Sequence, residues 1–406
     1  MQQPTYDLLL KGGRVIDPAN RRDVLADVAV CAGKIALVAP DIDPQTTAKV
    51  ADVTGCVVVP GLIDIHMHAY HTREPEGLSV MADSHSLRSG VTTVVDTGTA
   101  GAHHYLHFKR TVIDLAKTRV LAFINIVKSG MTGPFEQDIE EMDAELAASI
   151  VLANPDTCVG IKTAHYWTKE PFDAAHPPWT AVERAVEAGE LCRKPVMVDF
   201  WPRPERPYED LLLKKMRPHD IHTHVYAQQF PLLDESRKPL PFLAEARKRG
   251  IIFDVGHGFA SFWFRQAVPA IAEGFAPDSI STDLHGMNVN GPVVDMLTTM
   301  SKFLNMGLSL TEVIARSTVA PAREIGRPEL GTLSVGAEAD IAVLRQHDGD
   351  YPLVDCGRAT LSGRHLLECR LTLRAGDLVY NPAGLALPQW ADAPPAYWAI
   401  KQGQGP

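Results

Sequence analysis

The sequence predicts an α/β fold, a (β/α)8 TIM-type barrel with a small β-sandwich domain built from both chain ends. Apolar, strand-like runs recur at a spacing of about 30 residues with helical patterns between them, as in repeated βα units. Eight such runs match the strand number of a closed barrel. Short alternating strands and turns occupy both ends of the 406-residue chain, which is long enough for both parts.

The two chain ends share one pattern. Short strand-like runs separated by glycine-containing turns fill the first stretch, and the same pattern returns from Gly336 to Leu344 and from His365 to Arg374. Such runs and turns are typical of an antiparallel sheet. We therefore assign residues 1–58 and 333–385 to the β-sandwich domain, 59–332 to the barrel and 386–406 to a C-terminal arm.

The predicted barrel strands follow one another along the middle of the chain. They are Val57 to Ile65, Thr92 to Asp96, Val120 to Ile126, Cys158 to Lys162, Pro195 to Phe200, Ile221 to Val225, Ile251 to Val255 and Ser279 to Thr282. Active sites of such barrels lie at the carboxyl ends of the strands, so a polar residue that ends a run is a candidate site residue.

Charge and apolar content argue against two classes of partner. Lys and Arg total 39 against 49 Asp and Glu, a net charge of -10, and the basic residues form no cluster with interleaved aromatics. Nucleic acid is therefore not an expected partner. No apolar run reaches the roughly 20 residues that span a bilayer, so we expect a cytoplasmic protein that acts away from membranes. The six widely spaced cysteines predict reduced thiols.

A His-x-His pair ends the first barrel strand. His66 and His68 directly follow an apolar run, and side chains two residues apart on a strand share a face. Both imidazoles can therefore face one ion, and imidazole is a ligand that zinc and its neighbours prefer. Lys162, Asp199, His224, His257 and Asp283 end later runs and belong to the same predicted rim.

Several motifs together resemble the amidohydrolase superfamily, and within it the deacetylase-type, dihydroorotase-like metallohydrolases. The resemblance covers nearly the whole chain. The matching segments are Pro60 to His68, Gly90 to Asp96, Val159 to Lys162, Thr223-His224, Phe253 to Gly258, Ser281 to Gly286 and Gly336 to Ile341.

The resemblance implies a centre of two divalent ions, zinc or alternatively manganese. His66 and His68 would hold one ion with Asp283. Lys162, carboxylated by carbon dioxide, would bridge to a second ion held by the fifth and sixth strands, where His224 lies. Asp283 would accept a proton from a metal-activated water as general base. A buried lysine paired with a carboxylate, and an aspartate that caps a helix, remain the alternatives for Lys162 and Asp283.

The chain departs from the resembling pattern at the fifth strand, where Asp199 occupies the position expected for a histidine. A carboxylate oxygen reaches about as far as the ring nitrogen nearer the backbone, and carboxylates are acceptable zinc ligands. Asp199 therefore either ligates the second ion directly, or the site holds one ion and Asp199 contacts the substrate or a histidine.

Four residues are predicted substrate contacts. Tyr70 and His165 follow the ends of the first and fourth strands, and their rings favour a substrate with an aromatic or planar part. His257 lies between two glycines, which leave room for a ligand near the backbone. His285 follows the predicted general base by two residues.

Three functions remain open from the sequence. The first is a metal-dependent hydrolase that cleaves an amide or ester bond in deacylation of a small acid, aromatic acids included. The second is ring opening of a cyclic amide, as in dihydroorotase-like or hydantoinase-like enzymes. The third is a catalytically silent barrel that acts as a binding or assembly protein. The partner would be a small-molecule substrate, and the resemblance implies a homo-oligomer.

Overall fold

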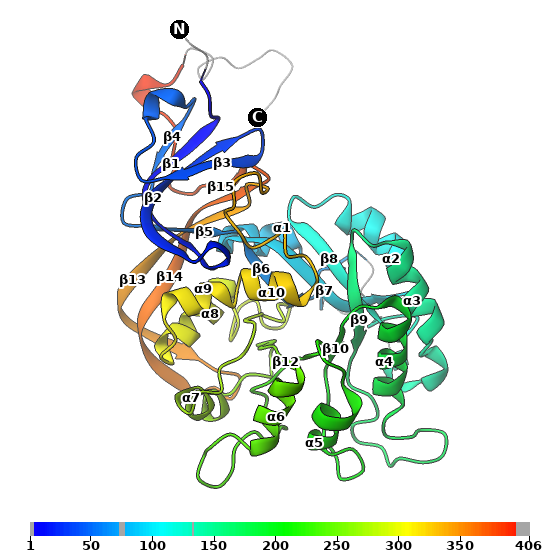
Figure 1. Cartoon of the computed structure of the whole chain (residues 1–406). Helices are drawn as coiled ribbons and strands as arrows, with labels where there is room; N and C mark the ends of the chain where they lie inside the picture. The colour runs from blue at the N-terminus through cyan, green and yellow to red at the C-terminus, as the bar shows by residue number, and fades with distance from the viewer. Residues whose placement is uncertain (1–3, 73–77, 132–133, 395–406) are drawn as a thin grey trace.

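The protein is described by a computed structural model that covers residues 4–72, 78–131 and 134–394. Figure 1 shows two parts, a sheet built from the blue N-terminal and orange C-terminal strands, and a barrel with helices outside it. The predicted fold class is therefore confirmed.

The terminal sheet has eight strands and joins both ends of the chain. The strand order is β15-β14-β13-β5-β1-β2-β3, and β4 pairs with β1. The bounds are β1 Leu8–Asp17, β2 Arg22–Cys31, β3 Lys34–Ala39, β4 Val50–Asp52, β5 Val57–Pro60, β13 Ile341–Val354, β14 Thr360–Arg374 and β15 Asp377–Tyr380. β5 lies between β1, which is parallel to it, and β13, which is antiparallel.

The terminal sheet curls around its own apolar core. Gly33, in the turn between β2 and β3, lies against the turn between β14 and β15, where a side chain on Gly33 would meet the carbonyl of Ala375. Side chains from the first and last strands fill one core cluster that includes Val28, Ile35 and Leu371. The two chain ends therefore form one two-layered unit.

Seven strands of the barrel are regular and run parallel in the order β6 to β12. Their bounds are β6 Leu62–Met67, β7 Val91–Gly101, β8 Arg119–Asn125, β9 Cys158–Thr163, β10 Val196–Val198, β11 Ile221–His222 and β12 Ile252–Phe253. An extended segment closes the ring, because Ser279 bridges to Asp254 beyond β12 and Leu284 bridges to Met67 of β6.

Two strand predictions are corrected. The run from Val57 to Ile65 is not one strand. It divides at Gly61 into β5 of the terminal sheet and β6 of the barrel, and Gly61 N donates to Asp340 O at 2.8 Å. A side chain at Gly61 would collide with Thr92, so the two sheets meet where only glycine fits. The predicted eighth strand makes isolated bridges rather than a regular ladder.

Helices follow most barrel strands and cover the outside of the barrel. Their bounds are α1 Ala82–His85, α2 Tyr105–Phe108, α3 Ala144–Ala153, α4 Thr180–Cys192, α5 Tyr208–Asp210, α6 Pro241–Arg249, α7 Phe264–Ala272, α8 Met296–Asn305, α9 Leu310–Ala315 and α10 Val319–Glu324. Asp143 and Asp295 begin α3 and α8 by accepting hydrogen bonds from backbone amides, and Ser309 and Glu312 form a capping box on α9.

The barrel interior is apolar below its rim. A cluster with Ile63, Ile65, Leu121, Phe123 and Met197 fills the inside of the ring, and a larger cluster lies between the strands and the helices. Because these layers occupy the strand bodies, the polar residues gather at the carboxyl ends.

Three further predictions concern the domain bounds, the cysteines and membrane-spanning segments. The domain bounds stay a prediction, and residues 395–406 of the proposed arm lie outside the described residues. All six cysteines are free thiols, as predicted. Among the described residues, no helix has the length and apolar character needed to cross a membrane.

Candidate metal centre

Two histidines extend from the end of β6 into the barrel mouth. His66 and His68 are only 1% and 5% exposed. Thr223 Oγ1 lies 2.8 Å from His66 Nδ1, and Thr99 Oγ1 lies 2.7 Å from His68 Nδ1. A partner at Nδ1 fixes each ring and leaves Nε2 available for a metal ion.

Asp283 faces both histidines from the closing segment. Its Oδ1 lies 3.5 Å from His66 Nε2 and 3.2 Å from His68 Nε2. This buried oxygen accepts no hydrogen bond from any residue that the structure describes. Two ring nitrogens that surround one oxygen in this way form a suitable donor set for a divalent cation.

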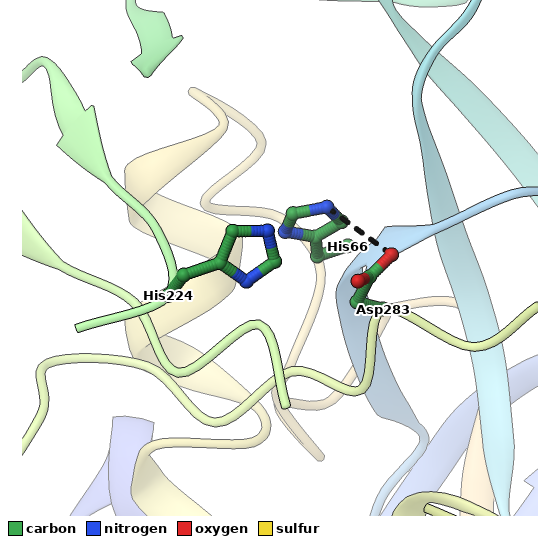
Figure 2. A group of neighbouring side chains, drawn as sticks. All are labelled: His66, His224 and Asp283. Atoms are coloured by element: carbon green, nitrogen blue, oxygen red, sulfur yellow. Dashed lines mark ion pairs between the residues drawn. The ribbon is translucent and has the colours of Figure 1, made fainter. Parts of the chain in front are cut away.

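His224 and Asp199 come from the sixth and fifth strand ends. His224 Nδ1 donates to the carbonyl of Gly256, and its Nε2 lies 3.5 Å from Asp199 Oδ2. One ligand atom each from His66, His224 and Asp283 lie within 4.8 Å of one another (Figure 2). These three buried residues fit a metal ion, and Asp199 extends the donor set.

Backbone strain marks the same positions. His224 and Asp283 have φ values of 62° and 49°, in the left-handed region that non-glycine residues seldom adopt. Such conformations cost on the order of 1–3 kcal/mol each and persist where the surrounding structure enforces them. At Gly256, a side chain would lie 2.9 Å from His66 Nδ1, so this glycine keeps space for the histidines.

The protonation states of the cluster suit metal binding. Burial lowers the pKa of His66 to about 3, so its imidazole is neutral. Burial alone would raise the pKa of Asp283, but the nearby imidazoles of His66, His68 and His285 bring it well below its ordinary value. Neutral imidazoles and ionised carboxylates are the forms that bind divalent metals.

Lys162 enters the same cavity from the end of β9. It is 2% exposed, and burial lowers its pKa, although Asp199 and Asp283 partly offset that effect. A side chain at Gly98 would lie 2.8 Å from Lys162 Cγ, so this glycine makes room for the lysine stem.

Asp254 anchors His66 through the hydroxyl group of Thr223. Thr223 Oγ1 donates to Asp254 Oδ2 at 2.8 Å, and Ser281 Oγ donates to the same oxygen at 2.7 Å. Since the Thr223 hydroxyl proton goes to Asp254, His66 Nδ1 must donate to Thr223. This chain of hydrogen bonds fixes the His66 tautomer that presents Nε2 to the cavity.

A Thr223→Val variant should therefore bind metal 10- to 100-fold more weakly, in the range seen when a partner of a metal ligand is lost. Valine keeps the shape and removes the hydroxyl. Competition with a chelator measures the affinity. Thr311→Val, which removes an exposed hydroxyl bonded to Asp23, is the control. Equal metal affinity in the Thr223→Val and Thr311→Val variants would contradict the proposed hydrogen-bond chain from His66 through Thr223 to Asp254.

The cluster lines a cavity of about 260 Å³ at the barrel mouth. Its wall comprises His66, His68, Leu78, Met131, Glu136, Lys162, Ala164, His165, Asp199, His224, Phe259, Ala260, Ser261, Asp283, His285 and Met287. All six predicted metal ligands are brought together here.

The four predicted substrate contacts divide into two pairs. His165 and His285 line the cavity, whereas Tyr70 and His257 do not. The Tyr70 hydroxyl pairs with His107 Nδ1 at 2.7 Å, and the ring packs against Phe108. Tyr70 therefore belongs to the wall behind the cavity. Its role as a substrate contact stays a prediction that this geometry does not favour.

His257 lies behind Asp283 in a buried pair with Lys302. Lys302 Nζ donates to His257 Nε2 at 2.6 Å and to Pro292 O at 2.8 Å, and His257 Nδ1 faces the carbonyl of Gly258. Both ring nitrogens are thus engaged away from the cavity. The geometry makes His257 a support for the segment that touches His224. Its role as a substrate contact stays a prediction that this geometry does not favour.

The buried amine of Lys302 should give a measurable pH dependence of stability. Burial lowers its pKa from 10.5 to about 7. Between these values the unfolded chain binds more protons, so stability rises with pH. The difference in unfolding free energy, wild type minus Lys302→Met, should increase by about 1.4 kcal/mol per pH unit over this window. Chemical denaturation at pH 7 and pH 9 measures it, and a constant difference would contradict the lowered pKa.

The place of Glu136 in the cavity wall could not be predicted from the sequence. Glu136 follows β8 by eleven residues and reaches the cavity wall, where Asn125 Nδ2 donates to its Oε1 at 3.2 Å. Burial raises its pKa. Nothing in the sequence near Glu136 distinguishes it from a surface loop residue. The end of β8 at Asn125 is the nearest clue.

Comparisons with known proteins identify relatives of this chain. A model of the amidohydrolase family matches residues 264–363. A deacetylase of Enterococcus faecalis is 31% identical over 383 residues, which cover 93% of this chain and all of that protein. A deacetylase of Agrobacterium fabrum is 30% identical over 356 residues, or 86% of this chain and 84% of that protein.

Two solved structures share the fold over nearly the whole chain. One is described as an adenine deaminase, with 30% identity and a TM-score of 0.83, covering 93% of this chain and 100% of the other. The second, described as a dihydroorotase, has 28% identity and a TM-score of 0.80, covering 92% and 99%. Fold and site together define a barrel hydrolase with a metal-binding cluster. The chain belongs to the amidohydrolase family.

Proposed function

We propose that the protein is a metal-dependent hydrolase that removes an acyl group from a small molecule by cleaving an amide or ester bond. One observation carries the proposal. His66, His68 and Asp283 converge at a cavity of a chain that matches a deacetylase along that protein's full length. The similarity supports the reaction class, and the donor set supports its dependence on metal.

His66, His68 and Asp283 would hold one divalent ion, and Lys162, Asp199 and His224 would hold a second. Zinc or manganese bound there would polarise the scissile carbonyl and lower the pKa of a water molecule.

Lys162 can join this donor set only as a carbamate, because an ammonium repels cations. Carbamate formation needs the neutral amine, and burial lowers the lysine pKa in that direction. The product is an anion with two oxygens. Its charge would replace a repulsion with an attraction at the centre of the cluster.

Asp283 is the proposed general base. The pKa of Asp283 lies below its ordinary value, so the side chain is ionised near neutral pH, and its Oδ1 faces the cavity without a hydrogen bond from any described residue. It can accept a proton from the attacking water and return it to the leaving group. His285, which also lines the cavity, is the proposed contact for the substrate or its leaving group.

The cavity limits the size and character of the substrate. Its volume of about 260 Å³ lies just below the 300–1,000 Å³ of typical drug-sized ligand sites. Phe259, Met131 and Met287 give part of the wall an apolar surface. These features support an acyl derivative of a small acid, with an apolar or aromatic part.

Parallel assays on acylated hydroxy acids, acylated amino acids and cyclic ureides test the proposal. We expect hydrolysis of an acyl derivative that depends on added zinc or manganese and stops with a chelator. Turnover of none of the acyl derivatives by metal-loaded protein would refute it. Similarity to the dihydroorotase structure favours ring opening of a cyclic amide as the second candidate, which the ureide arm identifies.

A catalytically silent barrel is not proposed, since the donor residues are all present and the matching relatives are enzymes along their length. The cytoplasmic location and the homo-oligomer remain predictions.

A further inference from the structure

We infer that His165 is a ligand of the second metal position, where it joins Asp199 and His224 and compensates for the histidine absent from the fifth strand. This inference rests on the metal dependence in the proposed function and assigns a residue to that same centre. His165 was expected from the sequence to contact substrate, and its surroundings point to a different role.

The first argument is a geometric parallel between two triads. In one, the Nε2 atoms of His66 and His68 approach a single oxygen of Asp283, at 3.5 and 3.2 Å. In the other, the Nε2 atoms of His165 and His224 approach a single oxygen of Asp199, at 2.8 and 3.5 Å. Each triad offers two imidazole nitrogens and one carboxylate, the donor set of many catalytic zinc sites.

The second argument is the unused capacity of Asp199. This carboxylate is 8% exposed, and its Oδ1 is buried with no hydrogen-bond partner among the described residues. A buried carboxylate oxygen without a partner is costly unless a cation is bound. Asp199 therefore has an oxygen left for an ion after its contacts with the histidines are counted.

The third argument is that the loop carrying His165 is held in place. Gln137 Nε2 donates to His165 O at 2.8 Å, and Trp167 N donates to Gln137 Oε1 at 2.6 Å. Trp167 also stacks on His176 at a centroid distance of 3.7 Å. These contacts fix the backbone on both sides of His165 while its ring projects into the cavity.

His165 differs from the other histidines in one respect that predicts weaker binding. Thr223, Thr99 and Gly256 hold the Nδ1 atoms of His66, His68 and His224. For His165 Nδ1, the described residues supply no such partner, and its side chain is 46% exposed. Missing outer partners cost 10- to 100-fold in metal affinity. The second ion should therefore bind more weakly than the first.

Metal analysis of the full chain tests the assignment without an activity measurement. Protein is produced with zinc and bicarbonate, passed through a desalting column and analysed for metal per chain. We expect about two ions for wild type, about one for His165→Ala, and two for the control His347→Ala. His347 lies on β13 of the terminal sheet, where it pairs with Glu368 at 2.7 Å, and it does not line the cavity. His165→Gln, which keeps much of the side chain, should also hold about one ion.

Titration with a chelator measures how tightly each of the two ions is bound. Wild type should release zinc in two steps at least 10-fold apart, and His165→Ala should lack the weaker step. One ion in wild type, or two in both His165 variants with an unchanged weaker step, would overturn the assignment. In that case His165 forms an ion pair with Asp199 that excludes the second metal, or is a spectator.

The outcome is separable from the proposed reaction. Loss of one ion in the His165 variants would support the assignment even if no acyl substrate were found. If the protein hydrolyses an acyl substrate but the His165 variants hold as much metal as wild type, the proposed reaction is supported and the assignment of His165 as a metal ligand is refuted.

Discussion

Asp283→Asn should reduce turnover by about 10²- to 10⁴-fold, the range for loss of a general base. Asparagine keeps the size of the side chain and the left-handed backbone that Asp283 adopts, because asparagine tolerates this region well. It cannot take the proton from water. Its amide oxygen can still contact the cluster that Asp283 Oδ1 faces, at 3.2 Å from His68.

The measurement combines steady-state turnover with metal content and thermal unfolding. Asp350→Asn is the control, since the Asp350 side chain is 94% exposed and pairs with Arg364 on the terminal sheet. A folded, metal-loaded Asp283→Asn protein with near-normal turnover would remove Asp283 from the role of base. A variant that loses metal would be compared with wild type at saturating metal.

Lys162→Ala should lose bound metal and activity together, with turnover at least 10²-fold below wild type. The physical reason is the removal of the proposed bridging anion from a buried site, which leaves the remaining carboxylates and imidazoles to hold two cations. Alanine also leaves a space beside Gly98 that the lysine stem fills in wild type. Short-chain carboxylates that enter this space should restore part of both properties.

Lys162→Met is the matched control for this rescue. Methionine is neutral and fills most of the lysine volume, so acetate or propionate should restore neither metal nor turnover. Metal content and turnover are measured across a carboxylate titration for both variants. Full metal content in Lys162→Ala without added carboxylate would show that the lysine does not bridge.

The predictable part of the site lies where local pattern and barrel topology agree. His66, His68, Lys162, His224 and Asp283 each lie at the end of a strand-like run, and the closed ring brings the ends of those runs to one rim. Alternation within a strand shows which side chains share a face. The topology then converts positions far apart in sequence into neighbours in space.

Other features depend on contacts that no local pattern encodes. Thr99 of β7 and Thr223, which follows β11, orient the histidines, and such partners look like ordinary strand threonines in the sequence. Glu136 reaches the cavity from a loop. The glycines beside His257 suggested space for a ligand, but the space at Gly258 is needed by Asp283, whose Oδ2 would lie 2.6 Å from an added side chain.

The division of the run at Gly61 into strands of two different sheets also could not be predicted from the sequence. Val57 to Ile65 is apolar except for Asp64 because both halves are buried, one in the terminal sheet and one in the barrel. Burial on both faces removes the alternation that would mark a change of sheet. The glycine is the single visible sign of the crossing.

The position of β5 between β1 and β13 has a consequence for synthesis on the ribosome. Val58 pairs with Val343, so the edge of β5 that faces β13 remains open until most of the chain has been translated. At about 5–20 residues per second, this interval lasts roughly 15 to 60 s. During that time the nascent chain exposes an apolar strand edge, a template for unwanted pairing. Chaperone demand should therefore peak before chain release and fall sharply once the last strands emerge.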